Sequence, residues 1–321
     1  LTSVNAINGG RKNMIINGGF DVWQRGTSFT TAGYAADRWN FALSGATGSF
    51  SRQTFPNGQT DVSGAKYFAR MSFSAGNNHC GLNYNHEYVE SIQNRTVTFS
   101  FYAKGSAEPS GGIKIRLGIV ATGGSNAPDQ DIALTTSWAK HSFTFNVPST
   151  SGMTIDSTSY IQIQIVQPAA DTGTSAWDID LANVQLELGS VATDFEHRSY
   201  GEELALCQRY YEQSYAQGAA VGSANRAGSV GNGGTQGQTS TGEIHGGTIQ
   251  FSVEKRVQPT ITFYDHAGTS GKGERLNAGI AWFSGSTMAV TLGNAKNIVF
   301  VSTTGNAATG AFAHYTADAE L

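Results

Sequence analysis

The chain has 321 residues, of which 14% are charged and 11% aromatic, and its formal net charge is -4. The lack of any basic run excludes nucleic acid and anionic membrane surfaces as partners, and no apolar stretch is long enough for membrane insertion. Low charge and 40 glycines favour an all-β fold with many turns. Cys80 and Cys207 are expected to be reduced thiols rather than a disulfide framework.

Residues 1–12 carry little pattern and are predicted to form an N-terminal arm or linker. From 13 to 198 the sequence predicts one strand after another. Strict alternation of apolar and polar residues is clearest at 97–103, 113–119, 141–147 and 161–165. Alternation with one polar face is typical of antiparallel strands half buried in a sandwich, so we expect a β-sandwich here.

The strand WDIDLANVQLEL at 177–188 changes its alternation once. Its apolar residues occupy odd positions up to Leu181 and even positions from Val184 onward. One extra residue in a strand produces this shift, so we predict a β-bulge near Ala182 and Asn183.

A polar, glycine-bearing break interrupts the apolar opening NMIINGGFDVWQRG at residues 13–26. Carbonyl groups freed by glycines, together with carboxylates, suit a hard cation such as Ca²⁺. We therefore predict a structural calcium ion that pins the first strand to the last, with the ligands Asn17, Asp21, Asp178 and Asp180. The alternative is an Asx-type turn with solvated carboxylates.

A helix is predicted over 199–216 as a connection between two domains. Ser199 followed by Glu202 forms a capping box at its start. An apolar i, i+3, i+7 stripe follows, made of Leu204, Cys207 and Tyr211. Because this stripe is broad and aromatic, we expect the helix to lie at the axis of a homotrimer or to pack on a sandwich.

Residues 217–321 are predicted to form a second, smaller β-sandwich that begins with a Gly-rich loop over 217–247. We expect that loop to be ordered. Six short strands are predicted at 248–256, 260–265, 279–283, 288–292, 297–302 and 310–317.

The aromatic residues divide into expected core anchors and expected ligand contacts. Trp39, Trp138 and Trp177 lie where a sandwich needs buried anchors. Sugar rings stack on exposed aromatic residues, which favours those in loops or turns. The predicted glycan-binding residues are Tyr34, His79, Tyr84, His86, Tyr88 and Trp282.

Most of these residues fall in NNHCGLNYNHEY at 77–88, a stretch rich in hydrogen-bonding side chains. The competing interpretation is a polar loop that crosses the sandwich surface. No nucleophile elbow, phosphate-binding loop or zinc-protease motif occurs in the sequence, so we expect no enzyme.

The runs NGGFD, ADRW (36–39) and WDIDLANVQLELG resemble those of β-jelly-roll carbohydrate-binding modules over roughly residues 13–190. The resemblance implies a jelly roll for the first sandwich and, in many members, a structural calcium between its two ends. The sequence departs from the family pattern at Leu181 and Ala182, where an acidic residue usually precedes the valine.

A second resemblance spans nearly the whole chain. The runs GRKNMIINGGFDVWQRGTSF, TDFEHRSYGEELALCQRYYEQSY and AFAHYTADAEL look like C-terminal regions of bacteriophage tail fibre and related virion appendage proteins. It implies a non-catalytic homotrimer, made in the host bacterial cytoplasm, that joins other virion tail proteins and binds host-surface polysaccharide. The alternatives are a purely structural appendage, such as a head fibre, collar or baseplate part, and a glycan depolymerase.

Overall fold

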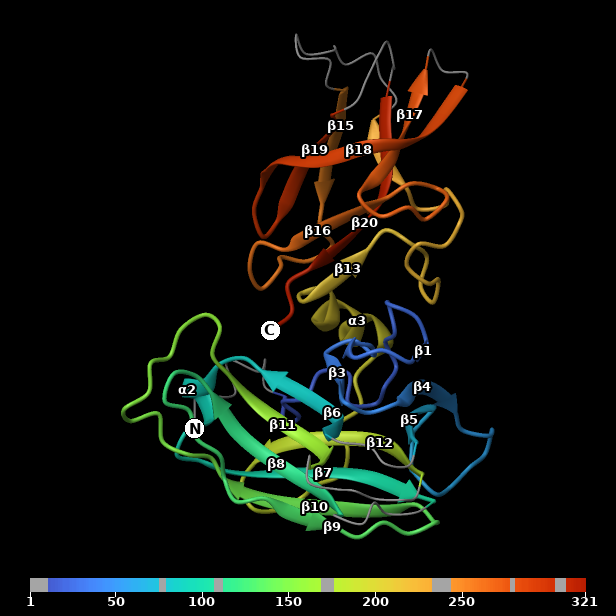
Figure 1. Cartoon of the computed structure of the whole chain (residues 1–321). Coiled ribbons are helices and arrows are strands. Elements are labelled where there is room, and N and C mark those ends of the chain that lie inside the picture. The colour runs from blue at the N-terminus through green and yellow to red at the C-terminus, as the bar shows by residue number, and fades with distance from the viewer. Residues whose placement is uncertain are drawn as a thin grey trace. The chain divides into compact units, whose positions relative to one another are not determined.

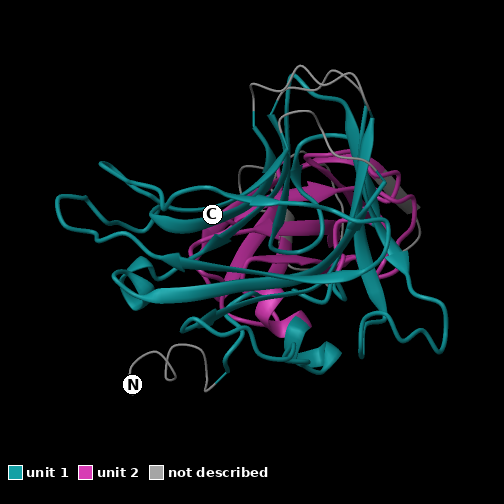
Figure 2. Cartoon of the chain, turned by 90° about the horizontal axis from the view of Figure 1, so that it is seen from below, with its two compact units in different colours: residues 1–22, 27–203, 321 teal, residues 23–26, 204–320 magenta. Residues whose placement is uncertain are grey.

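A computed structural model describes seven stretches of the chain, namely residues 11–74, 79–106, 112–168, 176–232, 244–277, 281–303 and 310–321. The fold is all β, as the composition predicts, and the chain divides into two compact units (Figure 2). Unit 1 comprises residues 1–22, 27–203 and 321, and unit 2 comprises 23–26 and 204–320.

Unit 1 is a sandwich of two six-stranded antiparallel sheets (Figure 1). Sheet A contains, in spatial order, β1 (Ser28–Phe29), β4 (Gly48–Thr54), β5 (Tyr67–Phe73), β12 (Trp177–Leu188), β7 (Thr96–Gly105) and β10 (Ala139–Asn146). Sheet B contains β2 (Gly33–Tyr34), β3 (Trp39–Ser44), β6 (His79–His86), β11 (Tyr160–Gln167), β8 (Ile113–Val120) and β9 (Gln130–Ile132). The chain passes back and forth between the sheets, which is the arrangement of a jelly roll.

The alternation that predicts the strands also selects the buried face of each sheet. The four segments with strict alternation lie in β7, β8, β10 and β11, and their apolar positions fill the space between the sheets. Trp39 and Trp177 are buried as expected. The register of β12 against β7 shifts between Ala182 and Gln185, which confirms the predicted bulge.

Asn17 explains the polar break in the opening segment. It is fully buried in the left-handed backbone conformation, with a φ of 60°. Its amide group donates to the carbonyls of Val22 and Asp37 and accepts from the Val22 N–H. The indole of Trp39 donates to the Asn17 carbonyl at 3.0 Å, and the Asn17 N–H donates to the carboxylate of Glu203 at 2.6 Å. One side chain and its own backbone thus connect three separate segments of unit 1, namely the opening segment, residues 37–39 and the helix residue Glu203.

A second layer of contacts attaches the same segment to β12 and to the residues after it. The N–H of Val184 donates to the carbonyl of Gly18 at 2.9 Å, and a Cβ at Gly18 would lie 2.0 Å from the Val184 carbonyl oxygen. Arg198 donates to the carbonyl of Asn13 and pairs with Glu203 at 3.2 Å. Gly18 is therefore needed because the backbone of β12 comes too close for a side chain, and Asn17 is needed because its hydrogen bonds satisfy buried backbone groups.

Unit 2 contains the remaining strands, which pair around β20. They are β13 (Tyr211–Gln213), β14 (Val230–Asn232), β15 (Ile244–Gln250), β16 (Thr260–Tyr264), β17 (Lys272–Asn277), β18 (Ala281–Gly293), β19 (Asn297–Ser302) and β20 (Gly310–Asp318). The second half of β20 pairs with β13 and β16, and its first half with β14 and β17. A buried cluster that includes Phe251, Phe263 and Phe300 forms the core of this unit.

Two details of unit 2 differ from the sequence prediction. Residues 281–283 and 288–292, predicted to lie in two separate strands, belong to one strand, β18, whose register against β17 shifts beside Ser284 and Gly285. One strand thus continues through a β-bulge at that point. The predicted strand 248–256 ends at Gln250, and β17 is an additional strand. Of the Gly-rich loop, residues 233–243 lie outside the described residues.

The connecting helix, α3 (Tyr200–Gln208), is shorter than predicted. Ser199 does cap it, since its hydroxyl accepts from the Glu202 N–H at 3.3 Å, but Tyr211 belongs to strand β13. Cys207 and Tyr211 are already buried within the single chain. The apolar stripe therefore gives no reason of its own to place this helix at a trimer axis, and the trimer stays a prediction.

The first prediction concerns the Asn17 network. Asn17→Ala should lower the free energy of unfolding by about 3 kcal/mol, because it leaves several buried backbone groups without partners. Asn94→Ala is the matched control, since Asn94 also has a left-handed backbone (φ 55°) but an exposed side chain. The control should cost only about 1 kcal/mol. Denaturant unfolding measures both, and equal losses would show that the hydrogen bonds of Asn17 contribute nothing.

Candidate functional site

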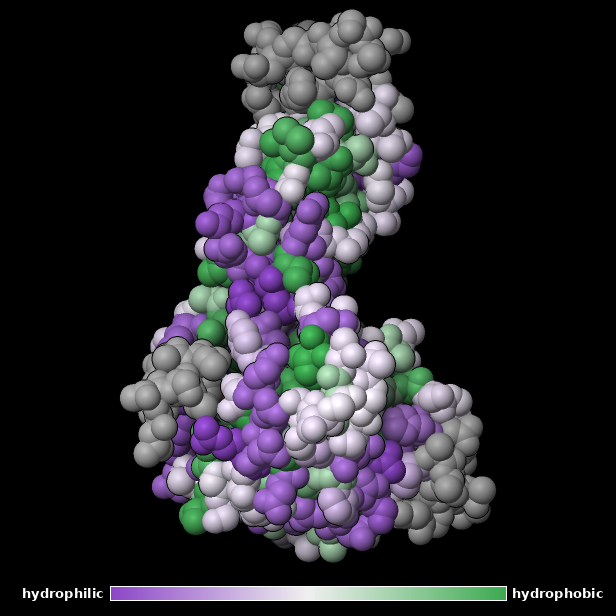
Figure 3. All heavy atoms as spheres, turned by 90° about the vertical axis from the view of Figure 1, so that its left-hand side faces the viewer, coloured by the Kyte–Doolittle hydropathy of each residue, from purple (hydrophilic) through white to green (hydrophobic). Residues whose placement is uncertain are grey.

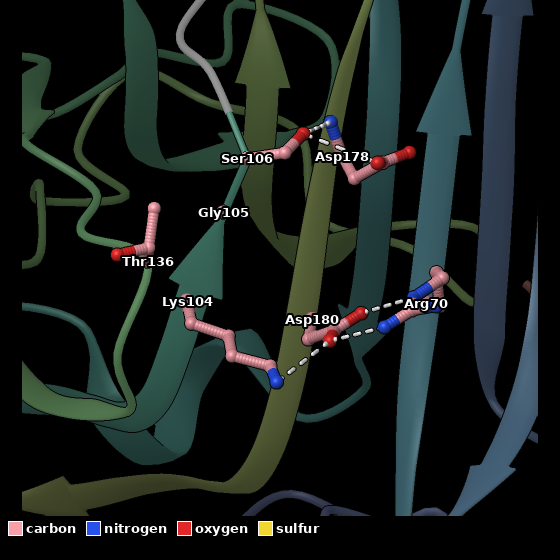
Figure 4. Close-up of a pocket in the computed structure, with 7 residues that line it drawn as sticks. All are labelled: Arg70, Lys104, Gly105, Ser106, Thr136, Asp178 and Asp180. Atoms are coloured by element: carbon pink, nitrogen blue, oxygen red, sulfur yellow. Dashed lines mark hydrogen bonds and ion pairs between the residues drawn. The ribbon is translucent and has the colours of Figure 1, made fainter.

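A pocket of about 260 Å³ lies on the outer face of sheet A (Figure 4). Strands β5, β7 and β12 form its floor, and the segment before β10 forms one wall. The lining residues are Arg70, Lys104, Gly105, Ser106, Thr136, Asp178 and Asp180. Alternation places these polar side chains outward because their neighbours Met71, Ala103 and Ile179 fill the core.

The charged groups of the pocket form one row across three strands. Arg70 and Lys104 pair in register with Asp180, from its two sides. Arg70 donates to both Asp180 oxygens, at 2.6 and 2.8 Å, and the Lys104 ammonium lies 3.7 Å from the same carboxylate (Figure 4). The Asp180 side chain is only 4% exposed, while those of Arg70 and Lys104 are 41% and 31% exposed. Hydrogen bonding to Asp180 raises the pKa of Arg70.

A second carboxylate, that of Asp178, lies at the other end of the pocket. The Ser106 hydroxyl donates to it at 3.1 Å, and the Asp178 N–H donates back to the Ser106 hydroxyl oxygen at 3.2 Å. Asp178 is partly exposed. Its carboxylate therefore offers hydrogen-bond acceptor sites to a molecule in the pocket.

An aromatic cluster borders the charged row. The ring centroid of Trp138 lies 5.2 Å from that of Phe55 and 5.4 Å from that of Phe68, and Tyr102 packs beside them. The ammonium of Lys104 lies 5.2 Å from the centre of the Trp138 ring, which joins the cluster to the pocket. Phe55 and Phe68 are buried, whereas Trp138 and Tyr102 are partly exposed.

The prediction that Trp138 is a core anchor is therefore wrong. In β10 the core residues are the odd-numbered Phe143 and Phe145, so an even-numbered Trp138 falls on the outer side. The alternation of apolar residues in this strand can be seen in the sequence, and it indicates that Trp138 lies on the outer face of the sheet. The structure thus places a partly exposed indole beside donors and acceptors, which is a combination that a carbohydrate site uses.

Two of the predicted glycan-binding residues are excluded by burial. Tyr84 is 1% exposed, and its hydroxyl accepts from the Ile16 N–H while its ring packs on Trp39 at 5.1 Å. His86 is 6% exposed. Both belong to β6, a strand between β3 and β11 rather than a surface loop. The alternation of Cys80, Leu82 and Tyr84 was the sequence signal of a half-buried strand.

Tyr34, His79 and Tyr88 are not among the residues that line the pocket, and Trp282 belongs to unit 2. The hydroxyl of Tyr34 donates to the carbonyl of Leu321 at 2.8 Å, which gives it a structural partner. His79 is partly exposed at the start of β6, and Tyr88 is 45% exposed just before helix α2 (Val89–Ile92). Trp282 lies in β18, and its side chain is outside the described residues.

The outer face of sheet B carries a row of amide side chains, next to the charged pairs Lys114–Asp131 and Arg116–Asp129 of β8 and the β9 region. Gln164 donates to Asn83 at 2.9 Å, and Gln162 donates to Asn85 at 3.1 Å, so the amides satisfy one another across β6 and β11. Asn85 in turn donates to the hydroxyl of Tyr34. This second polar face competes with the sheet A pocket as a site for a sugar.

The four predicted calcium ligands are not brought together. The Asn17 side chain is fully used by Val22 and Asp37, and Asp180 is paired with Arg70. The opening segment meets β12 at Val184, four residues beyond Asp180, or about 13 Å at ~3.3 Å per residue. Burial raises the pKa of Asp21, and Lys66 opposes that effect.

The described residues contain no group of three or more His, Cys, Asp or Glu side chains that could hold a metal ion together. Asn17, Asp21, Asp178 and Asp180 are therefore not a ligand set, and buried hydrogen bonds join the two ends of the sandwich instead. Calcium binding as such stays a prediction. Within the same described part of the chain, no helix has the length and apolar character needed to cross a membrane.

No protein-family model matches the sequence, and no curated protein does either. Solved structures do match. A cyclase from Fischerella sp. TAU is 12% identical and covers 57% of this chain and 99% of its own, with a TM-score of 0.38. A CBM4 carbohydrate-binding module is 20% identical over 54% of this chain and 98% of its own, with a TM-score of 0.33.

A phage protein is also among these structural neighbours. The enzymatically active domain of tailspike protein 4 from bacteriophage CBA120 is 14% identical and covers 55% of this chain, with a TM-score of 0.33. The match spans only 21% of that tailspike chain. All three TM-scores are below 0.5, so what this chain binds has to be argued from its own residues.

The second prediction concerns His86, whose pKa is lowered to about 4 by burial and by the nearby Arg38, against the weaker opposing effect of Glu87. The unfolded chain binds a proton on this histidine near pH 6.5, while the folded chain does not bind it until about pH 4. Stability should therefore fall as the pH drops through this window, by up to ~3 kcal/mol. His86→Gln should flatten this part of the stability profile, measured by urea unfolding between pH 4 and 7, and an unchanged slope would contradict the assignment.

Proposed function

We propose that unit 1 binds carbohydrate on the outer face of sheet A, through the pocket around Asp180 and the adjoining ring of Trp138. The observation that carries this proposal is the contact between the two parts, where the Lys104 ammonium lies between the Asp180 carboxylate and the Trp138 ring. A sugar ring presents an apolar face to the indole and directs its hydroxyl groups toward Arg70 and Asp178.

The proposed role is recognition without catalysis. A glycosidase needs two carboxyl groups on opposite sides of the scissile bond, one of which holds a proton. Asp178 and Asp180 are alternate residues of one strand and project from the same face. Arg70 holds both oxygens of Asp180, which leaves this carboxyl group poorly placed to donate a proton to a substrate. Polar contacts and one stacked ring are sufficient for binding.

We further propose that the chain is the receptor-binding part of a bacteriophage tail fibre and binds host-surface polysaccharide. The sequence runs that resemble virion appendage proteins support this assignment, together with the sheet A pocket. Weak single sites gain strength when several copies engage one cell surface, so a homotrimer attached to other virion tail proteins fits the proposal. On the side of unit 1 that Figure 3 shows, hydrophilic residues predominate and hydrophobic ones are scattered, as expected of a surface in contact with water.

The third prediction tests the site. Trp138→Ala should weaken binding of the purified chain to its polysaccharide at least tenfold, or ~1.4 kcal/mol, because the stacking face is lost. The measurement is equilibrium binding on an array of purified bacterial capsular polysaccharides and O-antigens. Released oligosaccharides, assayed in parallel, would show that the chain is a depolymerase.

Two controls locate the binding face. Tyr88→Ala removes an exposed aromatic residue far from the pocket in sequence and should leave binding unchanged. Gln164→Ala disrupts the amide row of sheet B and should also leave binding unchanged. If Gln164→Ala abolishes binding and Trp138→Ala does not, the sugar binds on sheet B. If the wild-type chain binds no polysaccharide, a structural virion appendage becomes the better explanation.

A further inference from the structure

The balance of charge inside the sheet A pocket bears on the kind of sugar that it accepts. Its lining includes two cationic side chains, Arg70 and Lys104, and two carboxylates, Asp178 and Asp180. Both cations are already engaged by Asp180, one through two hydrogen bonds and the other as an ion pair at 3.7 Å. Asp178 adds a further carboxylate, and its charge also acts on Arg70.

A carboxylated sugar is disfavoured by this arrangement. To reach Arg70, its carboxylate has to displace Asp180, whose side chain is 4% exposed and has no other cation of the lining than Lys104. Leaving a nearly buried carboxylate without its partner costs more than an exposed ion pair returns. To reach Lys104 instead, it has to approach Asp178 and Asp180 at the same time. A cationic sugar is disfavoured as well, because Arg70 and Lys104 already occupy Asp180 and repel a further positive charge.

Resting on the proposed glycan binding, we infer that the sheet A pocket is selective for uncharged sugar residues and discriminates against uronic acids and other carboxylated sugars. Asp180 sets this selectivity, since it holds both cations of the pocket. Uncharged hydroxyl groups accept from the exposed N–H groups of Arg70 and Lys104 and donate to Asp178 without breaking an existing pair. Trp138 supplies the apolar contact whatever the charge of the sugar.

The test compares sugars that differ only in charge. Each carboxylated bacterial polysaccharide is printed on an array beside a form in which its uronic acids have been reduced to the corresponding neutral hexoses. The wild-type chain should bind the reduced form at least about tenfold more tightly than the carboxylated form. Tighter binding of the carboxylated forms would overturn the inference and leave the proposed glycan binding intact. Failure to bind any member would overturn the proposed function itself.

A substitution should then reverse the preference. Asp180→Asn leaves two cations against one carboxylate, so it should raise affinity for the carboxylated forms by about tenfold at low ionic strength, and added salt should remove the gain. Asp131→Asn is the matched control, because it removes the same charge from a 75% exposed residue that pairs with Lys114 on sheet B. A gain of equal size in the control would attribute the effect to net charge and overturn the assignment.

A second substitution keeps the test decisive if Asp180→Asn disturbs the fold. Lys104→Gln removes a partly exposed cation and leaves an excess of negative charge in the pocket. Both forms lose the hydrogen bonds of the ammonium group, but affinity for the carboxylated forms should fall at least about threefold more than affinity for the reduced forms, because only the carboxylated forms are repelled by the excess negative charge. Thermal unfolding of each variant shows whether it is folded. An unchanged ratio of the two affinities in folded Lys104→Gln would overturn the inference.

Discussion

The buried hydrogen bonds of Asn17 hold together segments that the sheets alone would leave apart. The residue joins the opening segment to the stretch before β3, to the indole of Trp39 and to Glu203. Each of these contacts replaces a hydrogen bond to water that burial removes, so none of them can be omitted without cost. Gly18 and Asn13 extend the same contacts to β12. The two ends of the jelly roll are therefore joined by a polar network that includes the charged pair of Arg198 and Glu203.

The sandwich offers two outer faces whose polar groups differ. Sheet B presents amides that bond to one another, beside the charged pairs Lys114–Asp131 and Arg116–Asp129. Sheet A presents a charged row beside a partly exposed indole, where the groups are positioned by strand register. Because Arg70, Asp180 and Lys104 come from neighbouring strands of one sheet, their spacing is rigid, and rigid polar groups are what selective recognition of a sugar requires.

Much of the fold was accessible from the sequence because burial imposes a period of two on every strand. The strands of the first sandwich, the bulge in β12 and the cap at Ser199 all follow from local rules. The errors have a common cause as well. Tyr84 and His86 lie in a polar-looking stretch that occupies the middle of sheet B, and Trp138 lies outside because of its phase rather than its type. In each case the composition of the stretch was misleading and the alternation was informative.

The sequence by itself determined that this chain is an all-β protein with a β-sandwich, since apolar periodicity and turn residues act locally, and its resemblance to carbohydrate-binding modules implied the jelly roll. It also contained the residues of the opening network, but not their partners. Only the tertiary structure decided that the Asn17 N–H donates to Glu203, and that Asp180 faces Arg70 and Lys104 across two strand pairs. The physical reason is that such contacts join residues more than a hundred positions apart, or depend on the register between strands. No local pattern in the sequence encodes that register.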